Sequence, residues 1–379
     1  MSFSNLGLAP SLLRALEGQN ITQPYPIQKE AIPNIIFGKD VLGIAKTGSG
    51  KTASYVLPIL MLAQGQPKLK DRHISTLVMV PTRELAVQVQ DVFHSLGEFL
   101  PKKVKSKAVF GGVSINPQMM SLHGTQVLVA TPGRLLELVE KKALHLSSVR
   151  TLVLDEADKL LNLGFQEEMD QLFDLLPSKR QNLLFSATLD EKVTNLQKVM
   201  LQNPVIINTA PVEVNNNVDL INQTGYFVSE EKKGPLLRYL VEEKEMDQVL
   251  VFVSSVFKAD HLVKKLVKNG LRAAAIHGKK SQGSRTDSLV KFKNKNINVL
   301  VATDLLARGI DIEFLPFVVN YELPRSPKDF VHRIGRTGRA ENPGEAITFV
   351  TPEDAHHFKI IQKKMKKWID MVDSEKLLR

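Results

Sequence analysis

Short apolar runs that alternate with amphipathic stretches constrain the fold of this chain more than any other feature of its sequence. The apolar runs are continuous rather than alternating, which is typical of strands buried on both faces of a parallel sheet. Stretches with helical periodicity lie between them, as at Arg83–Leu96, Glu167–Leu176 and Ala259–Asn269. This order of elements predicts an α/β fold with mostly parallel sheets. The predicted strands are Val41–Ile44, Ile74–Val80, Val127–Thr131, Thr151–Leu154, Asn182–Phe185, Val249–Val253, Ala273–Ile276, Ile297–Ala302, Phe317–Asn320 and Ala346–Val350.

An Asn-rich interruption divides the chain into two parts of domain size. Asn203-Pro204 opens one further short strand, and the stretch 208–222 that follows holds five Asn and has no helical period. The expected parts are an N-terminal domain over 1–207, a linker over 208–218 and a C-terminal domain over 219–379. Val-Leu-Val-Ala-Thr occurs at both 127–131 and 299–303, at a comparable place in each part, which indicates a duplicated domain.

Composition excludes several classes of protein. The chain has no cysteine, so disulfides, thiol catalysis and zinc sites built on cysteine are excluded. No apolar run approaches the ~20 residues of a membrane-spanning helix, and we expect a cytoplasmic location. The 50 Lys and Arg against 40 Asp and Glu give a formal net charge of +10, which favours a polyanionic partner.

A phosphate-binding pattern follows the first predicted strand and precedes a helical stretch. Its glycines let backbone N–H groups turn towards phosphate oxygens, and the helix presents its N-terminus to the anion. We expect Lys51 to reach the β- and γ-phosphates and Thr52 to place its hydroxyl on Mg²⁺. The expected nucleotide-binding residues here are Ala45, Lys46, Thr47, Gly48, Ser49, Gly50, Lys51 and Thr52.

An acidic tetrad, Asp155-Glu156-Ala157-Asp158, follows the predicted strand Thr151–Leu154. Carboxylates at the carboxyl end of a buried parallel strand lie where α/β folds bind ligands. Asp155 suits coordination of Mg²⁺ through water, and Glu156 suits orienting or deprotonating an attacking water. Taken alone, such a cluster is more often an acidic helix N-terminus; its combination with the phosphate-binding pattern favours catalysis.

With both motifs, the chain resembles the DEAD-box family of ATP-dependent RNA helicases over 3–350. Among bacterial members it most resembles the short RhlE-type proteins. The further motifs that carry the resemblance are Pro81-Thr82-Arg83-Glu84-Leu85-Ala86, Gly111-Gly112, Thr131-Pro132-Gly133-Arg134, Ser186-Ala187-Thr188, Val251-Phe252-Val253-Ser254-Ser255, Gln282 with Arg285, Ala302-Thr303-Asp304, Ala307-Arg308-Gly309-Ile310-Asp311 and His332-Arg333-Ile334-Gly335-Arg336-Thr337-Gly338-Arg339.

The resemblance implies two tandem RecA-like domains joined by a flexible linker, with ATP and RNA bound across the cleft between them. It assigns Arg336 and Arg339 as arginine fingers on the γ-phosphate. Arginine suits that role because it stays charged and offers forked donors to phosphate oxygens. It places Asp311 on the ribose. The residues it assigns to coupling between the domains are Ser186, Thr188, Asp158, His332 and Arg333.

Adenine recognition is where the sequence departs from the family pattern. Gln28 is present, and its amide suits pairing with the N6 and N7 edge of adenine. Ile21 stands where the family has a stacking aromatic, so packing over the base would be aliphatic. Asn20 and Tyr25 replace the usual Gly and Thr. Phe3 matches the upstream aromatic of the family.

The remaining motifs suit a surface that binds along the backbone of an RNA strand, which we call the RNA track. Small residues let the track approach phosphates, hydroxyls donate to phosphate oxygens and arginines neutralise them, so binding without sequence specificity is expected. The choice of RNA over DNA is implied by the resemblance alone. The expected RNA-binding residues are Pro81, Thr82, Arg83, Gly111, Gly112, Thr131, Gly133, Arg134, Arg285, Thr303 and Arg308.

Lysines gather near the C-terminus, from Lys363 to Lys367, and Trp368 follows them. We expect a short basic helix with a solvated lysine face and with Trp368 packed inwards.

The sequence thus predicts an RNA-dependent ATPase that unwinds short duplexes or remodels RNA–protein complexes, with ATP and Mg²⁺ as cofactors. Protein partners in ribonucleoprotein complexes are compatible with this prediction. Two alternatives remain open: an ATP-gated RNA clamp, and a DNA helicase or translocase with the same two-domain core.

Overall fold

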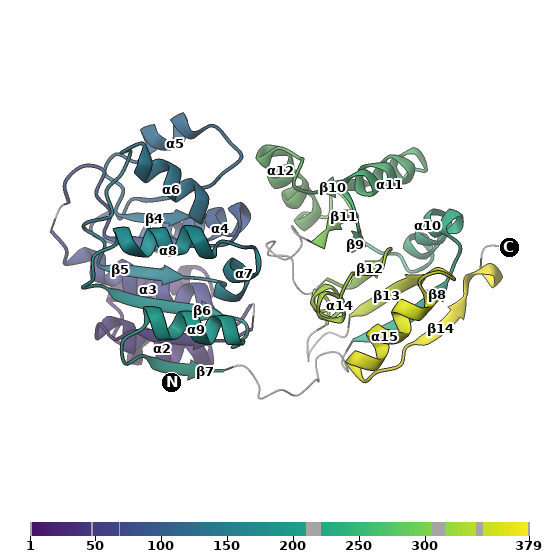
Figure 1. Cartoon of the computed structure of the whole chain (residues 1–379), viewed down its shortest axis with the longest axis horizontal. Helices are drawn as coiled ribbons and strands as arrows, with labels where there is room; N and C mark the ends of the chain where they lie inside the picture. The colour runs from purple at the N-terminus through teal and green to yellow at the C-terminus, as the bar shows by residue number, and fades with distance from the viewer. Residues whose placement is uncertain are drawn as a thin grey trace. The chain divides into compact units, whose positions relative to one another are not determined.

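Each half of the chain is built on its own sheet of parallel strands (Figure 1). The computed structural model describes residues 2–46, 48–67, 69–209, 221–304, 315–338 and 344–377. The chain divides into two units, Met1–Val212 and Glu213–Arg379. Strand β7 extends to Asn208, so the first residue of the predicted linker belongs to the first sheet. Most of that linker lies outside the described residues, and its limits stay a prediction.

The first unit orders its strands β3-β4-β2-β5-β6-β1-β7, and every pairing between these described strands is parallel. Its elements are η1 (Phe3–Leu6), α1 (Pro10–Gly18), α2 (Pro26–Ile36), β1 (Val41–Ile44), α3 (Lys51–Gln64), β2 (Thr76–Met79), α4 (Arg83–Gly97), β3 (Ser106–Val109), α5 (Ile115–Ser121), β4 (Val127–Ala130), α6 (Pro132–Glu140), β5 (Thr151–Leu154), α7 (Ala157–Asn162), α8 (Gln166–Leu175), β6 (Gln181–Ser186), α9 (Glu191–Met200) and β7 (Val205–Asn208).

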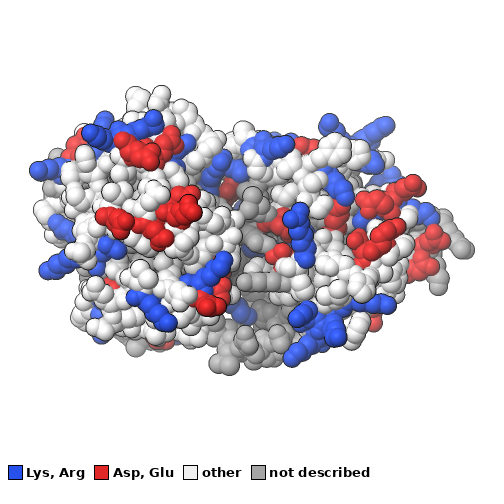
Figure 2. Space-filling model, viewed as in Figure 1, with Lys and Arg blue, Asp and Glu red and all other residues white. Residues whose placement is uncertain are grey.

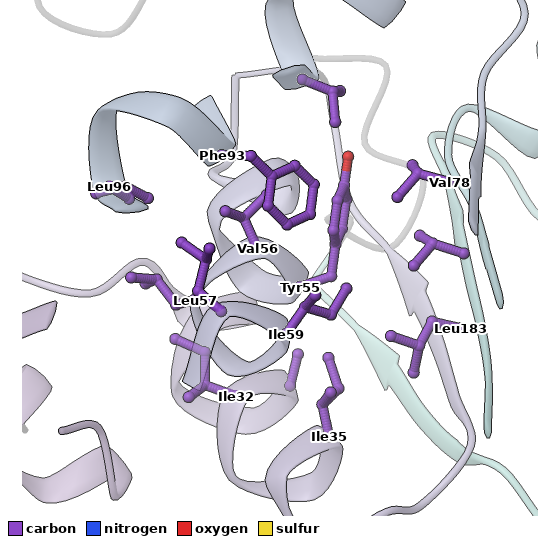
Figure 3. Close-up of a cluster of buried hydrophobic side chains, with 14 of the residues drawn as sticks. Ile32, Ile35, Tyr55, Val56, Leu57, Ile59, Val78, Phe93, Leu96 and Leu183 are labelled. Carbon is purple, nitrogen blue, oxygen red and sulfur yellow. The ribbon is translucent and has the colours of Figure 1, made fainter. Parts of the chain in front are cut away.

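Two apolar clusters, one on each face of the first sheet, explain why its apolar runs are continuous. Val41 belongs to the cluster that the sheet forms with α1 to α4, whereas its neighbour Leu42 belongs to the cluster with α6 to α9. Successive strand residues point to opposite faces, so both must be apolar. Figure 3 shows the first cluster, where Tyr55 of α3 and Phe93 of α4 face Val78 and Leu183 of the sheet.

The second unit repeats this design, with the strand order β10-β11-β9-β12-β13-β8-β14. Its elements are β8 (Asn222–Phe227), η2 (Glu230–Lys232), α10 (Lys233–Glu243), β9 (Val249–Val253), α11 (Val256–Lys268), β10 (Ala273–Ile276), α12 (Gln282–Lys293), β11 (Val299–Thr303), β12 (Phe317–Asn320), α14 (Pro327–Ile334), β13 (Glu345–Val350), α15 (Ala355–Met365), β14 (Asp370–Asp373) and η3 (Ser374–Lys376). Among the helices that the structure describes, none combines the length and the apolar composition that crossing a bilayer requires.

The strand order confirms the predicted α/β fold and explains the repeated pentapeptide. The two copies of Val-Leu-Val-Ala-Thr give β4 and β11, which hold the second position in their respective sheets. Three strands were not predicted: β3, β8 and β14. They lie at or next to a sheet edge, where one side of the strand is less buried, and their residues are too polar to stand out as apolar runs.

The prediction for the C-terminal tryptophan was wrong. Helix α15 ends at Met365, and Lys366 takes a left-handed conformation with φ of 55°. Trp368 follows outside the helix with 71% of its surface exposed, so it is not a core residue. Its neighbour Ile369 is the residue that packs inwards, into a cluster with Phe358 and Ile361.

Gly43 provides a test of how tightly the first sheet is packed. A Cβ atom added there would lie 2.6 Å from Cδ1 of Phe185, whose ring is fully buried. We expect Gly43→Ala to lower the free energy of unfolding by about 1–3 kcal/mol through overpacking. Urea unfolding followed by circular dichroism measures this. Gly18→Ala is the control, because its Cβ would make only an ordinary 3.6 Å contact with Phe99. Equal midpoints for the two variants would show that β1 tolerates the extra atom.

Candidate functional site

The predicted nucleotide residues of the first unit follow three neighbouring strands. Segment 45–52 follows β1, segment 155–158 follows β5, and segment 186–188 begins at the last residue of β6. These strands are adjacent in the order β5-β6-β1, and all run parallel. Their carboxyl ends therefore bring the three segments together at one edge of the sheet, the usual place for ligands in α/β folds.

The phosphate-binding loop has the backbone that its glycines predict. Gly48 and Gly50 take positive φ values of 74° and 84°, and Gly50 caps the N-terminus of α3. Lys51 is 7% exposed, and its Nζ donates to the carbonyl of Ala45 at 2.6 Å. Burial lowers the pKa of the Lys51 ammonium, although nearby carboxylates, that of Asp155 first, act in the opposite direction.

Asp155 lies on the same edge, buried and held by two donors. The Tyr55 hydroxyl donates to Oδ2 at 2.8 Å, and the backbone N–H of Glu156 donates to Oδ1 at 2.8 Å. Burial raises the pKa of Asp155, while Lys51 and the Tyr55 hydrogen bond partly offset that rise. Burial also raises the pKa of Tyr55 well above its usual range, so the hydroxyl stays a donor.

Tyr55 is a site residue that sequence reasoning missed. It follows Lys51 by four residues on α3, and side chains four apart share one face of a helix. That spacing was the available signal, because it places the hydroxyl beside the same carboxylate that Lys51 approaches. Figure 3 shows the ring enclosed by apolar side chains, with its hydroxyl oxygen at one end of the cluster.

Glu156 has a strained backbone, and one of its two carboxylate oxygens makes no hydrogen bond to a described residue. Its φ of 52° and ψ of 49° lie in the left-handed region, which L-residues rarely occupy. Oε1 accepts from Nζ of Lys159 at 2.7 Å. Oε2 is buried and makes no hydrogen bond to any residue in the described part of the chain. This oxygen is therefore available to a further donor, such as a water molecule.

Asp158 links the acidic tetrad to the segment after β6. Its Oδ1 accepts from the Ser186 hydroxyl at 3.0 Å, and its Oδ2 accepts from the Thr188 hydroxyl at 3.5 Å. The Ser186 hydroxyl lies within hydrogen-bonding distance of both the Thr188 carbonyl and the Thr188 N–H. The structure thus brings together three of the five residues predicted to couple the domains, all within the first unit.

The predicted adenine residues lie beside the phosphate-binding loop. Gln28 is 2% exposed, and its Nε2 donates to the Gly50 carbonyl at 3.1 Å while its Oε1 accepts from the Tyr25 N–H at 2.9 Å. Nε2 keeps a second hydrogen that it can donate, and Oε1 keeps a second lone pair that can accept a hydrogen bond. Ile21 and Phe3 pack against the first apolar cluster. The ring of Tyr25, 46% exposed, lies against Gly50.

The predicted RNA residues of the first unit follow the other neighbouring strands, β3, β4 and β2. The guanidinium of Arg83 lies so close to Gly112 that a Cβ there would overlap it. Thr82 caps α4 by accepting from the Leu85 N–H at 3.3 Å. Pro81 and Thr131 are buried, whereas Gly111 and Gly133 have open space where a side chain would project.

Arg134 is placed differently from the other predicted RNA residues. Its side chain is 6% exposed, and Nε donates to Glu137 at 3.0 Å. Nη2 donates to the carbonyl of Val113 at 2.8 Å. These bonds tie the Gly111-Gly112 loop to α6, so the residue supports the loop from inside the protein.

Arg333, predicted to couple the domains, is buried inside the second unit. Its Nε and Nη2 donate to the two carboxylate oxygens of Asp304 at 2.5 and 2.8 Å. Nη1 donates to Oδ1 of Asn320 at 3.2 Å and to the carbonyl of Glu322 at 2.6 Å. The guanidinium also lies over the ring of Phe252, 4.9 Å from its centroid. These contacts fix α14 on the sheet.

Of the other predicted residues of the second unit, some belong to the described part of the chain and some do not. Arg285 is buried on α12 and donates to Gln282, while Thr303 ends β11. His332 and Arg336 are half-buried, on α14 and just after it. The predicted residues that lie outside the described part of the chain are Thr47, Arg308, Asp311 and Arg339.

Comparisons with known proteins agree with this arrangement. A model of the DEAD/DEAH box helicase family matches residues 25–196, and a model of the helicase conserved C-terminal domain matches residues 231–341. The DEAD-box ATP-dependent RNA helicase RhpA of Helicobacter pylori is 38% identical over 374 residues, which are 98% of this chain and 74% of that protein. The helicase CshA of Streptococcus pneumoniae is 40% identical over 97% of this chain and 69% of its own length.

Solved structures give the same family. Saccharomyces cerevisiae Dbp5 bound to RNA and ADP BeF3 matches with a TM-score of 0.83 and 30% identity, over 100% of both chains. A DEAD box protein from Methanococcus jannaschii matches with a TM-score of 0.54 and 34% identity, over 98% of this chain and 99% of that one. The predicted tandem RecA-like fold is confirmed, while the narrower resemblance to RhlE-type proteins stays a prediction. The chain therefore belongs to the DEAD-box ATP-dependent RNA helicases, a family of ATP-hydrolysing, RNA-binding enzymes.

Proposed function

We propose that this chain is an RNA-dependent ATPase that separates short RNA duplexes or remodels RNA–protein complexes by closing its two domains on ATP and one bent RNA strand. The observation that carries this proposal is the catalytic edge of the first unit. There Lys51 follows β1, and Asp155 and Glu156 follow β5, so they lie at the carboxyl ends of the two strands that flank β6, next to the segments predicted to bind the RNA backbone. ATP and RNA can drive closure only through their greater affinity for the closed state.

Within this proposal, each side chain of the catalytic edge has one task. Lys51, now bonded to the Ala45 carbonyl, transfers its donors to the β- and γ-phosphates of ATP. Glu156 accepts a proton or hydrogen bond from the attacking water through Oε2. Arg336 and Arg339 stabilise the charge of the transferred phosphoryl group, where such arginines contribute about 10³–10⁵ in rate.

The donor set at Asp155 fits a Mg²⁺ ion that accompanies ATP. Carboxylate and hydroxyl oxygens are the ligands that this ion prefers, and it commonly uses one or two protein ligands together with phosphates and water. Asp155 and the Thr52 hydroxyl would hold it. When bound, the ion would neutralise charge that develops on the phosphates.

The RNA track is proposed to contact the backbone and not the bases. Arg83, the loop at Gly111-Gly112 and the open surface at Gly133 meet phosphates in the first unit, and Arg285, Thr303 and Arg308 do so in the second. Arg134 acts through the loop that it holds. Binding should therefore be insensitive to sequence and should weaken steeply as salt concentration rises. The cytoplasmic location and the domain limits stay predictions.

The defining test is ATP turnover with RNA, with matched DNA and without polymer, for the wild type and for Glu156→Gln. We expect RNA to stimulate the wild type strongly and DNA to have little effect. Glu156→Gln should lose at least about 10²-fold in turnover, because the variant side chain is a poor base. Glu167→Gln is the control, since it removes an exposed carboxylate from α8.

Two results would replace this proposal with another. Equal stimulation by DNA would indicate a DNA helicase or translocase. Negligible turnover with any polymer, combined with ATP-dependent RNA binding, would indicate a clamp.

Tyr55→Phe tests the support of Asp155. The Tyr55 hydrogen bond favours the carboxylate form and opposes the rise in the Asp155 pKa that burial causes. Removing the hydroxyl should raise this pKa further, so the acidic limb of the kcat/KM profile for ATP should move to higher pH. A pH series of RNA-stimulated ATPase assays measures the shift. Tyr226→Phe, in the core of the second unit, is the control. Superimposable profiles for Tyr55→Phe and the wild type would remove Tyr55 from this role.

A further inference from the structure

The C-terminal end of α15 carries a concentrated positive charge. Residues 355–369 contain five lysines and no acidic residue. Four of these lysines, Lys359, Lys363, Lys364 and Lys366, are exposed. Figure 2 shows Lys and Arg side chains gathered over α15 in the second unit. We call the surface formed by these four lysines and Trp368 the C-terminal basic surface.

The tryptophan in this surface is held outwards by a defined turn. Gln362 is buried on α15, and its Oε1 accepts from the Ile369 N–H at 2.8 Å. Ile369 is 7% exposed and fills the cluster beneath α15. With Ile369 anchored inwards and Lys366 in a left-handed turn, Trp368 projects into solvent with 71% exposure.

The C-terminal basic surface is separate from the proposed RNA track of the second unit. Helix α15 packs on α14, where the rings of Phe330 and Phe358 lie 6.1 Å apart, and it belongs with β13, β8 and β14. The track residues Arg285 and Thr303 lie on α12 and β11, and α12 packs with β10 and β11 at the other end of the sheet.

We propose that the C-terminal basic surface binds a single-stranded stretch of RNA that extends beyond the track, with a base stacked on Trp368 and phosphates held by the lysines. An exposed indole has a flat face for any base, and base stacking on aromatic residues is tolerant of sequence. The adjacent lysines, with no acidic residue among them, supply the positive charge that a phosphate backbone attracts. This inference rests on the proposed function, because it extends the RNA contacts of the same enzyme.

The chain offers a direct probe, since Trp368 is its only tryptophan. Its fluorescence is measured as RNA oligomers are added: first a short oligomer that only fills the track, then the same oligomer with single-stranded extensions at the 5′ or 3′ end. We expect quenching with one of the extended RNAs and none with the short one. The quenching should weaken as salt concentration rises.

Variants separate stacking from charge. Trp368→Ala should weaken binding of the extended RNA by about 5-fold or more, the loss of one stacked base. Lys363→Glu combined with Lys364→Glu should weaken it by about tenfold at low salt. The matched control is Lys264→Glu combined with Lys265→Glu, which makes the same charge change on the exposed face of α11. All variants should keep wild-type ATPase activity with the short RNA.

The outcomes distinguish this inference from the proposed function. ATPase stimulation by short RNA without quenching by any RNA would overturn the inference and leave the proposed function intact. Equal quenching by short and extended RNA would make the surface part of the track and also overturn it. Quenching by polyglutamate or by anionic vesicles as strong as that by RNA would overturn it in favour of a different partner. Absence of stimulation in the wild type would overturn the proposed function itself.

Discussion

The rest of the structure depends on burying a parallel sheet on both of its faces. Every strand in the middle of such a sheet must be apolar on both sides, which leaves no room within it for polar chemistry. Polar and charged groups are therefore confined to the loops, and parallel strands collect their carboxyl-end loops at one edge. The sheet order β3-β4-β2-β5-β6-β1 then divides that edge into a row of segments predicted to bind the RNA backbone and a row of segments predicted to bind the nucleotide. Groups that are predicted to act in catalysis, and that lie far apart in the sequence, are brought to one edge of the sheet for this reason.

Because this constraint is expressed in local composition, the sequence alone was enough to predict the α/β class, most strands and the main motifs. Strand β8 escaped prediction because Asn222 and its neighbours read as part of the Asn-rich interruption. Contacts between distant segments escaped as well. The bond from Tyr55 to Asp155 joins residues a hundred positions apart, and the spacing of Tyr55 from Lys51 on α3 was the one local signal for it. Arg134 was predicted to bind RNA as part of the motif Thr131-Pro132-Gly133-Arg134, whereas its partners, Glu137 and Val113, are known only once the fold is known.

The two units show how one topology supports different chemistry. Both place a strand at the sixth position of the sheet, β1 in the first and β8 in the second. A glycine loop with a buried lysine follows β1, whereas η2 and α10 follow β8, where the buried Lys233 forms an ion pair with Glu230 at 2.7 Å. In the second unit the buried Arg333 instead pairs with the half-buried Asp304, and this pair holds the helix that precedes Arg336. If Arg336 acts on ATP as proposed, this helix fixes the point from which it extends.

The left-handed backbone of Glu156 sets a cost in stability against the role proposed for its carboxylate. A non-glycine residue in this conformation is strained by about 1–2 kcal/mol, and glycine would occupy it without that strain. A glycine here would relieve that strain, but it would also lose the ion pair with Lys159 and the carboxylate that is proposed to act on water. In the proposed function, the strained backbone is the cost of holding a carboxylate at the edge of the sheet where the attacking water would lie.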